Sequence, residues 1–328
     1  MRAVQVSLCL AGLVTAGCCH LPMSGQARPR QPLPEELAVE FSYPKTFDLA
    51  ARHNTVNHRS GYDIERIEMA ALPDRFDSNR VVALDYYAPR GEGRKPVVLV
   101  LPISGGGYGL EEYLSRYFAR RGWAAVIVHR RKLPREPANG EELNTVFRQS
   151  IIDGRRAIDW IETRPELDSS RIGVFGISLG GIRAAMLAPV DARVQVAVIA
   201  LAGGDLPYIL RHTTERGIAR RREAFLKEHS LKPDEMEEMF RTGWLCDPNA
   251  LAPYVPRDKV LLVLGDFDRV VPIRKGRELR EKMGRPETIF LPTGHYSSLL
   301  CILYLRHESY KFLRDRFYPG RSAGRRPG

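Results

Sequence analysis

The sequence predicts an α/β fold: a mostly parallel, doubly wound sheet with helices on both faces and an inserted helical cap. Short apolar, β-branched runs alternate along the chain with segments of helical character, which is the order that parallel sheets require. Between residues 203 and 256 this alternation gives way to a charged, proline-punctuated stretch of helical composition, which we interpret as the cap. The 328 residues, 44% of them hydrophobic, suffice for one sizeable core.

The expected elements follow from the apolar patterns. Residues 144–163 are the clearest helix, because apolar residues recur there at near-helical spacing and Asn144 is a candidate cap. Residues 52–59 include His53 and His58 without the spacing of a metal site, and we expect an exposed loop. The remaining strands are expected at 81–87, 95–101, 123–128, 193–201, 259–264 and 287–292, and the remaining helices at 111–121 and 179–187.

Residues 171–181 carry the strongest chemical signal. A short β-prone stretch runs into Gly-Ile-Ser-Leu-Gly-Gly at 176–181 and then into helix-forming residues. Glycines two positions before and after Ser178 permit a sharp strand-to-helix turn that exposes the serine hydroxyl. The N-terminal amides of the following helix point toward the same place, where they stabilise negative charge. Ser178 is therefore a candidate nucleophile.

An acid and a histidine follow Ser178 in the order that such a nucleophile needs. The buried-type strand 259–264 ends beside Asp266 and Asp268, and the last strand is followed by His295. In this hypothesis Ser178 attacks an acyl carbonyl, His295 accepts and returns its proton, and the carboxylate fixes the imidazole tautomer.

This order of serine, acid and histidine resembles the α/β-hydrolase superfamily of serine hydrolases. The forms Gly-Ile-Ser-Leu-Gly-Gly and Gly-x-x-Asp-x-x-Val-Pro are most similar to its dienelactone hydrolase, acyl-peptidase and acetyl-esterase branches. The resemblance covers about residues 81–318. It implies that Asp268, which precedes Val271-Pro272 at the family's spacing, is the acid, with Asp266 as the alternative.

An oxyanion hole requires two backbone donors. One is expected to be the N–H of Leu179, the residue after the nucleophile. The second is expected in the glycine-rich segment 102–109, at the position where the family usually carries His-Gly. Here Ile103-Ser104 replaces the histidine, so Ser104 and Gly105 are both candidates.

The cap and the cysteines leave alternatives open. We place the cap at about 204–256, between the sixth strand and the acid-bearing strand. Its Tyr208, Phe240, Trp244 and Leu245 either line the acyl pocket or anchor the cap to the core. Cys246 and Cys301 either form a disulfide or remain buried thiols, because the sequence does not give their distance.

The N-terminus resembles a bacterial lipoprotein signal. Arg2 precedes an apolar stretch that ends in small residues before Cys18, and it is too short to span a bilayer as an anchor. The resemblance implies a signal peptide at 1–17 and acylation of Cys18, with plain secretion or an apolar cytosolic helix as alternatives. We place a tether at 18–40, the catalytic domain at 41–318 and a basic disordered tail at 319–328. The expected location is the bacterial cell envelope, through a lipid anchor, or else the periplasm or the exterior.

The formal charge of +11 is scattered over several short basic clusters, which indicates a solvated basic surface. No motif for nucleic acid or metal has the required context, and no cofactor is expected.

The sequence therefore favours a membrane-tethered hydrolase that cleaves a carboxylic ester of a small or lipid-like acyl substrate. A peptidase, thioesterase or lactone hydrolase on the same residues is an alternative, although a peptidase would usually need an additional recognition domain. An alternative from another class is a non-catalytic envelope binding protein, which an intact triad disfavours.

Overall fold

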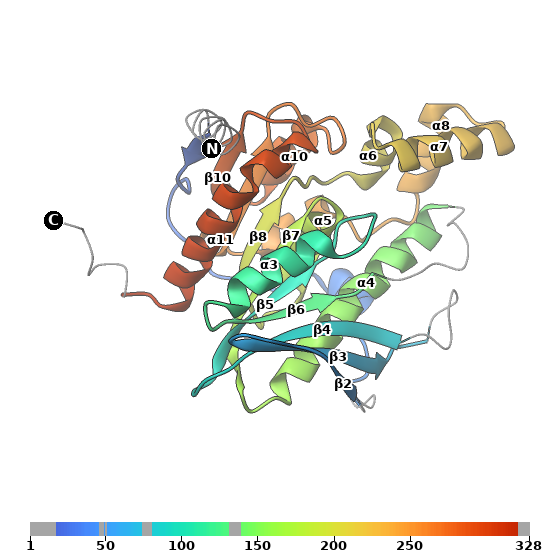
Figure 1. Ribbon diagram of the computed structural model, residues 1–328. Helices are drawn as coiled ribbons and strands as arrows, with labels where there is room; N and C mark the ends of the chain where they lie inside the picture. Colours follow the sequence, from blue (N-terminus) through green and yellow to red (C-terminus); the bar gives the residue numbers. More distant parts are fainter. Residues whose placement is uncertain (1–17, 46–48, 50, 74–80, 131–138, 321–328) are drawn as a thin grey trace, which may run out of the picture.

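The computed structural model describes residues 18–45, 49, 51–73, 81–130 and 139–320, and their ten strands form one sheet (Figure 1). The strand order is β1-β10-β9-β8-β7-β5-β6-β4-β3-β2. The strands are β1 (Cys19–Leu21), β2 (Arg52–Arg59), β3 (Tyr62–Ala70), β4 (Val81–Pro89), β5 (Lys95–Leu101), β6 (Ala124–Val128), β7 (Leu167–Ile177), β8 (Val194–Ala200), β9 (Val260–Gly265) and β10 (Glu287–Leu291).

The six central strands, from β6 to β10 in the sheet order, are parallel to one another. Their apolar, β-branched sequences are buried on both faces, as expected of a parallel sheet covered by helices. Side chains alternate between two cores: Leu99 and Leu101 enter one, and Val98 and Val100 enter the other.

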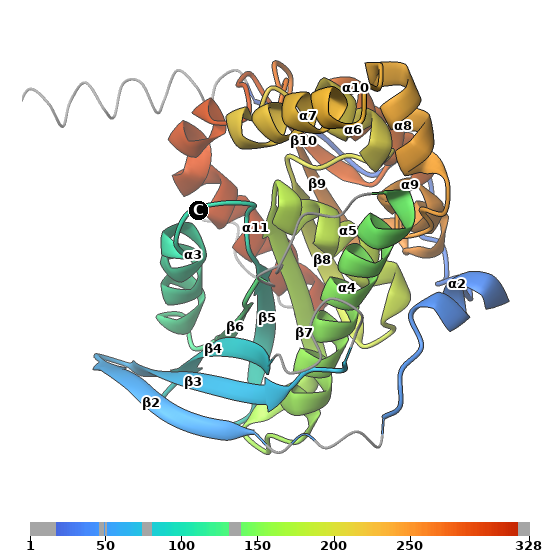
Figure 2. The ribbon, with the colours of Figure 1, turned by 90° about the vertical axis from the view of Figure 1, so that its right-hand side faces the viewer.

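Helices cover both faces of this sheet (Figure 2). Helices α3 and α11 pack against the Val98 face, whereas α4, α5 and α10 pack against the Leu99 face. The predicted α/β fold with a mostly parallel sheet is confirmed. The α-helices are α2 (Glu35–Glu40), α3 (Gly109–Ala119), α4 (Gly140–Glu162), α5 (Leu179–Val190), α6 (Leu206–His212), α7 (Arg216–Glu228), α8 (Pro233–Arg241), α9 (Pro248–Leu251), α10 (Ile273–Lys282) and α11 (Ile302–Phe317).

Helices α6 to α9 occupy the segment in which the sequence predicts a cap (Figure 1). Three short 3-10 helices complete the assignment: η1 (Ala252–Tyr254), η2 (Arg257–Lys259) and η3 (Ser297–Cys301). Of these, η3 joins the loop that carries His295 to α11.

The edge beyond β6 differs from the sequence prediction. The expected exposed loop at 52–59 is wrong, because these residues form β2, which pairs antiparallel with β3. β3 also pairs antiparallel with β4, and β4 pairs antiparallel with β6. β2 is an edge strand of largely polar sequence, so it lacks the apolar pattern by which a strand is predicted.

Helix α4 begins earlier than predicted, and its cap is Asn139, whose side chain accepts the N–H of Glu142 at 2.9 Å. Asn144 lies inside the helix and is buried. Its amide group donates to Glu40 at 2.7 Å and accepts the N–H of Cys246 at 2.7 Å, so it joins the N-terminal segment to the cap.

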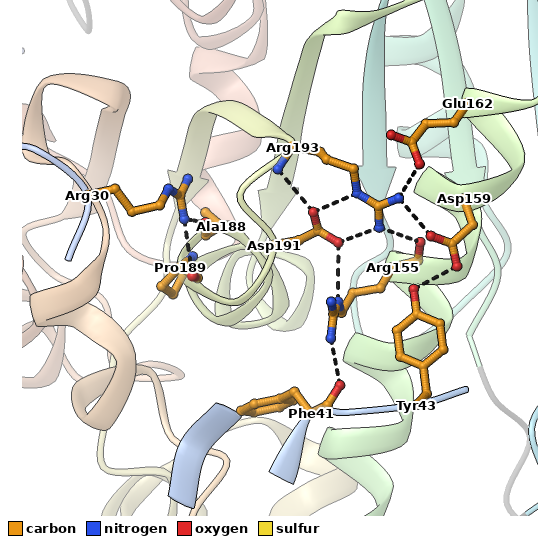
Figure 3. A network of polar contacts seen from close by, with 10 residues as sticks. All are labelled: Arg30, Phe41, Tyr43, Arg155, Asp159, Glu162, Ala188, Pro189, Asp191 and Arg193. Carbon is orange, nitrogen blue, oxygen red and sulfur yellow. Dashed lines mark hydrogen bonds and ion pairs between the residues drawn. The ribbon is translucent and has the colours of Figure 1, made fainter. Parts of the chain in front are cut away.

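The segment predicted as a tether, 18–40, lies against the domain over much of its length. β1 pairs antiparallel with β10. Further along, the guanidinium of Arg30 donates to the carbonyls of Ala188 at 2.8 Å and Pro189 at 3.1 Å (Figure 3). The predicted signal peptide, 1–17, and residues 321–328 of the predicted tail lie outside the described residues.

A buried polar network holds the chain around residues 41–43 against α4 (Figure 3). Asp191 accepts hydrogen bonds from Arg193 at 2.7 Å and from Arg155 at 3.2 Å. Arg155 also donates to the carbonyl of Phe41 at 2.6 Å, and the Tyr43 hydroxyl donates to Asp159 at 2.6 Å. The arginines thus join the N-terminal segment, α4 and the turn before β8 in one arrangement.

The described cysteines form no disulfide with one another. Cys246 and Cys301 do not pair, because Cys246 lies in the core on the Leu99 face and Cys301 in the core on the Val98 face. Cys18 instead lies beside Cys301: burial, together with the charge and the sulfhydryl hydrogen bond of Cys301, raises the pKa of Cys18 to about 11.

Candidate active site

Ser178 lies at the turn between β7 and α5, with a φ of 58° and a ψ of −123°. A positive φ is unfavourable for a serine, so its surroundings must hold it in place. The Ser178 N–H donates to the carbonyl of Ala200 at 2.9 Å. A Cβ on Gly176 would lie 2.1 Å from the Gly180 carbonyl oxygen, and one on Gly180 would lie 2.0 Å from that of Leu101. Both glycines are therefore required by backbone packing at this turn.

The structure brings Ser178, His295 and Asp268 together in one hydrogen-bonded series. Ser178 Oγ lies 2.9 Å from His295 Nε2, and His295 Nδ1 lies 2.7 Å from Asp268 Oδ2. Because an ionised carboxylate only accepts, we assign the ring proton to Nδ1, which leaves Nε2 free to accept the serine proton.

Backbone contacts fix Asp268 within this series. Asp268 Oδ1 accepts the N–H groups of Val270 and Val271, each at 2.9 Å. The side chain is 4% exposed, so both carboxylate oxygens are occupied out of water. The Val-Val-Pro sequence that follows the acid thus supplies the donors that orient the carboxylate.

Asp266, the alternative acid, has a different environment. Its side chain is partly exposed and lies 3.1 Å from Arg277. Its N–H donates to the carbonyl of Leu291, and that of Phe267 donates to the carbonyl of Thr293. The backbone around Asp266 therefore joins the loop with the acid to the loop with His295, while its side chain points to an arginine.

The glycine-rich loop after β5 faces Ser178. Ser104 lines the same two cavities as Ser178. The N–H of Ile103 is already taken, because it donates to Glu111 Oε1 at 2.9 Å. The N–H of Leu179 belongs to the first turn of α5, where amides have no acceptor within the helix.

Arg130, which the sequence reasoning missed, holds this loop in place. Its guanidinium donates to the carbonyls of Ile103 at 2.7 Å, Gly105 at 3.2 Å and Gly106 at 2.6 Å. It also lies over the ring of Tyr108, 4.7 Å from the centroid. Its position just after β6, at the carboxyl end of a parallel strand, is the signal by which it could have been found.

Two cavities meet at Ser178. One, of about 180 Å³, lies toward η3 and α11 and is lined mainly by apolar side chains, among them Leu201, Leu299 and Ile302. The other, of about 120 Å³, lies under the cap and includes Phe147 and Trp244. A substrate whose reacting carbon lies at Ser178 can therefore extend in two directions.

Of the four cap residues named from the sequence, one lines a cavity beside Ser178, and the other three make contacts elsewhere. Trp244 lines the cavity under the cap. Phe240 is buried in the core and packs against Phe225, and Tyr208 stacks on His212 with ring centroids 3.8 Å apart. Leu245 donates its N–H to the side chain of Asn144. The sequence did not indicate Glu215, which lines both cavities and lies at the start of α7.

The described residues contain no group of three or more His, Cys, Asp or Glu side chains placed to hold a metal ion. None of the helices assigned to them combines the length and the apolar sequence that a bilayer crossing requires.

Comparison with known proteins places the chain in a family. A family model described as the X-Pro dipeptidyl-peptidase (S15 family) matches residues 42–231, which include Ser178 and end before Asp268 and His295. An uncharacterized protein of Mycobacterium tuberculosis (strain H37Rv) is 32% identical over 149 residues, 45% of this chain and 33% of that protein. The chain therefore matches only about a third of that relative's length.

Solved esterase structures share the fold. The acetyl xylan esterase from Paenibacillus sp. R4 has a TM-score of 0.64 at 19% identity, over 85% of this chain and 96% of that one. Acetyl xylan esterase 1 from Thermoanaerobacterium sp. JW/SL YS485 has a TM-score of 0.64 at 17% identity, over 90% and 97%. These likenesses support the fold, and the resemblance to α/β-hydrolase serine hydrolases is confirmed. Because the family model matches more than half of the chain, the chain belongs to the X-Pro dipeptidyl-peptidase (S15) family.

Proposed function

We propose that the protein cleaves a carboxylic ester through an acyl-enzyme on Ser178, with His295 as general base and acid and Asp268 as the orienting carboxylate. The observation that carries this proposal is the hydrogen-bonded series from Ser178 Oγ to His295 to Asp268, at 2.9 and 2.7 Å. Serine, imidazole and carboxylate in this order form the arrangement that activates a hydroxyl for acyl transfer.

The reaction follows in two half-steps. Ser178 Oγ forms a bond to the acyl carbon while its proton passes to His295 Nε2. The tetrahedral intermediate then loses its alkoxide, which takes that proton from Nε2 and leaves as the alcohol. Water repeats the sequence on the acyl-enzyme, and the acid product leaves with Ser178 restored.

Two backbone amides are proposed to bind the oxyanion. The N–H of Leu179 is one, since the first turn of α5 has no internal acceptor for it. For the second donor we favour Ser104 over Gly105, because Ser104 lines both cavities beside Ser178. Arg130 is then a positioning residue, because it holds the carbonyls on either side of Ser104.

An ester is favoured over a peptide with a free N-terminus. Such a peptide carries a cation, which a carboxylate in the site would have to recognise. Among the described residues that line the two cavities, Glu215 is the single acid. Its carboxylate accepts the N–H of Ile218 at 2.6 Å at the start of α7, so it already has a partner. The family name nevertheless makes peptidase activity the second candidate.

Hydrolysis assays separate these candidates. p-Nitrophenyl esters of graded acyl length are compared with an aminoacyl-prolyl p-nitroanilide, and Ser178→Ala serves as the control. The proposal predicts turnover of the esters, no turnover in the variant, and little or none with the anilide. Preference for the anilide would establish the peptidase, and a folded protein inactive on both would favour a non-catalytic binding role.

Export and lipid attachment at Cys18 remain a separate proposal, supported by the apolar stretch and small residues before that cysteine. It is tested by expressing the full chain in a bacterium with labelled fatty acid. Label in the wild type and none in Cys18→Ala is the expected result, and an unlabelled, uncleaved chain would contradict it.

A further inference from the structure

Apolar side chains gather at the mouth of the candidate site. Of the eight large hydrophobic residues that are exposed among the described part of the chain, five lie here. Phe267, Leu300 and Leu303 are 69%, 67% and 56% exposed. We call the five residues the mouth patch: Phe267, Tyr296, Leu299, Leu300 and Leu303.

The mouth patch is continuous with the catalytic loops. Tyr296 precedes η3, Leu299 and Leu300 lie within it, and Leu303 lies in the first turn of α11, so these four exposed residues are close together in the chain. The carbonyl oxygen of Phe267 lies 3.3 Å from the Cβ position of Gly294, next to His295. Tyr296 and Leu299 also line the 180 Å³ cavity, so these two residues join the patch to the cavity, whereas Leu300 and Leu303 lie outside its lining.

The rim of this cavity also carries basic side chains, on α7. Glu215 lines the cavity together with Tyr296, and α7 begins immediately after it. Five of the 13 residues of α7 are Arg or Lys and two are Glu, and Arg216, Arg220 and Arg221 are exposed. Figures 1 and 2 show α7 and the beginning of α11 at the same end of the molecule, at the top of each view.

Cys18 lies beside η3, the element that carries part of the mouth patch. It packs against the same core as Cys301, the last residue of η3, and the two thiols interact. The N-terminal segment therefore reaches the domain at the element that carries Leu299 and Leu300.

From these contacts we infer that the mouth of the site docks on an anionic lipid bilayer through the mouth patch and α7. Exposed leucine and aromatic side chains lose contact with water when they enter the interface between headgroups and acyl chains. Arginines beside them are attracted to the negative headgroups. Apolar and basic groups on one rim match a lipid surface better than a second copy of this basic chain, whose α7 would repel its counterpart.

Docking in this orientation places the 180 Å³ cavity directly over the bilayer. This consequence rests on the proposed function: the substrate class would be an acyl ester dissolved in, or belonging to, the membrane. The docking itself does not depend on Ser178 being a nucleophile.

Vesicle flotation tests the surface. The full chain carries Cys18→Ser throughout, so that lipid attachment contributes to no sample. Leu300→Glu with Leu303→Glu removes the patch, and neither residue lines a cavity around Ser178. Val39→Glu with Val81→Glu makes the same change at two exposed apolar residues outside the patch. Vesicles contain phosphatidylcholine alone or mixed with phosphatidylglycerol.

The parent and the Val39/Val81 variant should bind the mixed vesicles equally, and the Leu300/Leu303 variant about tenfold or more weakly. Arg216→Gln with Arg220→Gln should weaken binding to mixed vesicles about tenfold and leave binding to phosphatidylcholine unchanged. Turnover of a soluble p-nitrophenyl ester by the Leu300/Leu303 variant should match the parent, which shows that it is folded.

Equal binding of the parent and the Leu300/Leu303 variant, or binding by neither, overturns the inference. A parent dimer that the variant converts to a monomer in light scattering, without a change in vesicle binding, overturns it in favour of a contact between copies. Ser178→Ala should bind vesicles like the parent. An inactive parent that still docks would therefore contradict the proposed function alone.

Discussion

Two buried carboxylates of this chain, Asp191 and Asp268, have opposite kinds of partner. Asp191 is held by the guanidinium groups of Arg193 and Arg155, which stay charged at any ordinary pH (Figure 3). Asp268 is held by two backbone N–H groups and by one imidazole, whose far nitrogen reaches a serine. The first arrangement pairs the carboxylate with permanent cations, whereas the second pairs it with a ring that can accept and return a proton during a reaction.

The arginine partners of Asp191 decide the direction in which its pKa departs from the ordinary value. On its own, burial raises the pKa of Asp191, but the hydrogen bonds and charge of Arg193 and the charge of Arg155 outweigh it and lower that pKa. A paired carboxylate of this kind stabilises the fold. A carboxylate whose one ionisable partner is a histidine can instead stabilise an imidazolium that forms during a reaction.

The largest effect is expected from Asp268→Asn. An amide facing His295 Nδ1 favours the wrong tautomer, so kcat should fall about 10⁴-fold while the fold persists. Asp266→Asn is the matched control, since Asp266 pairs with Arg277 and should change kcat little. Steady-state kinetics on a p-nitrophenyl ester measures both variants. A greater loss of kcat in Asp266→Asn than in Asp268→Asn would make Asp266 the acid of the triad.

Asp191→Asn should act on stability and leave kcat unchanged. Removing one partner of a buried ion pair costs about 3 kcal/mol, because the arginines lose their counter-charge. Since the folded-state pKa of Asp191 is lowered, its contribution is present above the unfolded pKa of about 3.9 and is lost as the pH falls through the folded value.

Denaturant unfolding of wild type and Asp191→Asn at several pH values tests this sign. The gap between their free energies of unfolding should be full at pH 6 to 8 and should narrow below about pH 4. A gap that widens at acid pH would show that Asp191 is not stabilised as a carboxylate.

A smaller effect is expected from Arg130→Ala. Loss of the three carbonyl contacts loosens the loop that holds Ser104, so kcat should fall about 10- to 100-fold with little change in KM. Arg94→Ala is the control, since Arg94 donates to the carbonyl of Leu167, away from the site. Equal kinetic losses in the two variants would mean that the Arg130 contacts are only structural.

The sequence predicts the elements around Ser178 because their signals are local. A strand, a glycine-flanked serine and a helix follow one another between residues 167 and 190, and β9 and β10 end just before Asp268 and His295. Burial on both faces makes these strands apolar throughout, which is easily detected. The central sheet and the approach of three distant residues at its edge were accordingly predictable.

The contacts that the sequence did not predict join distant segments or involve polar elements. β2 lacks an apolar pattern because it lies at the edge of the sheet. Asn144 resembles a cap in sequence, yet it is fixed by Glu40 and Cys246, far away in the chain. Arg130 clamps a loop 24 to 27 residues before it. None of these partners is encoded by a local motif.

The central claim is that Ser178 is an activated nucleophile, and a fluorophosphonate adduct located by peptide mass spectrometry tests it most directly. The wild type should carry one adduct, on Ser178; Ser178→Ala should carry none, and Asp268→Asn should react far more slowly. An adduct on another residue, or none on a folded wild-type protein, would contradict the account.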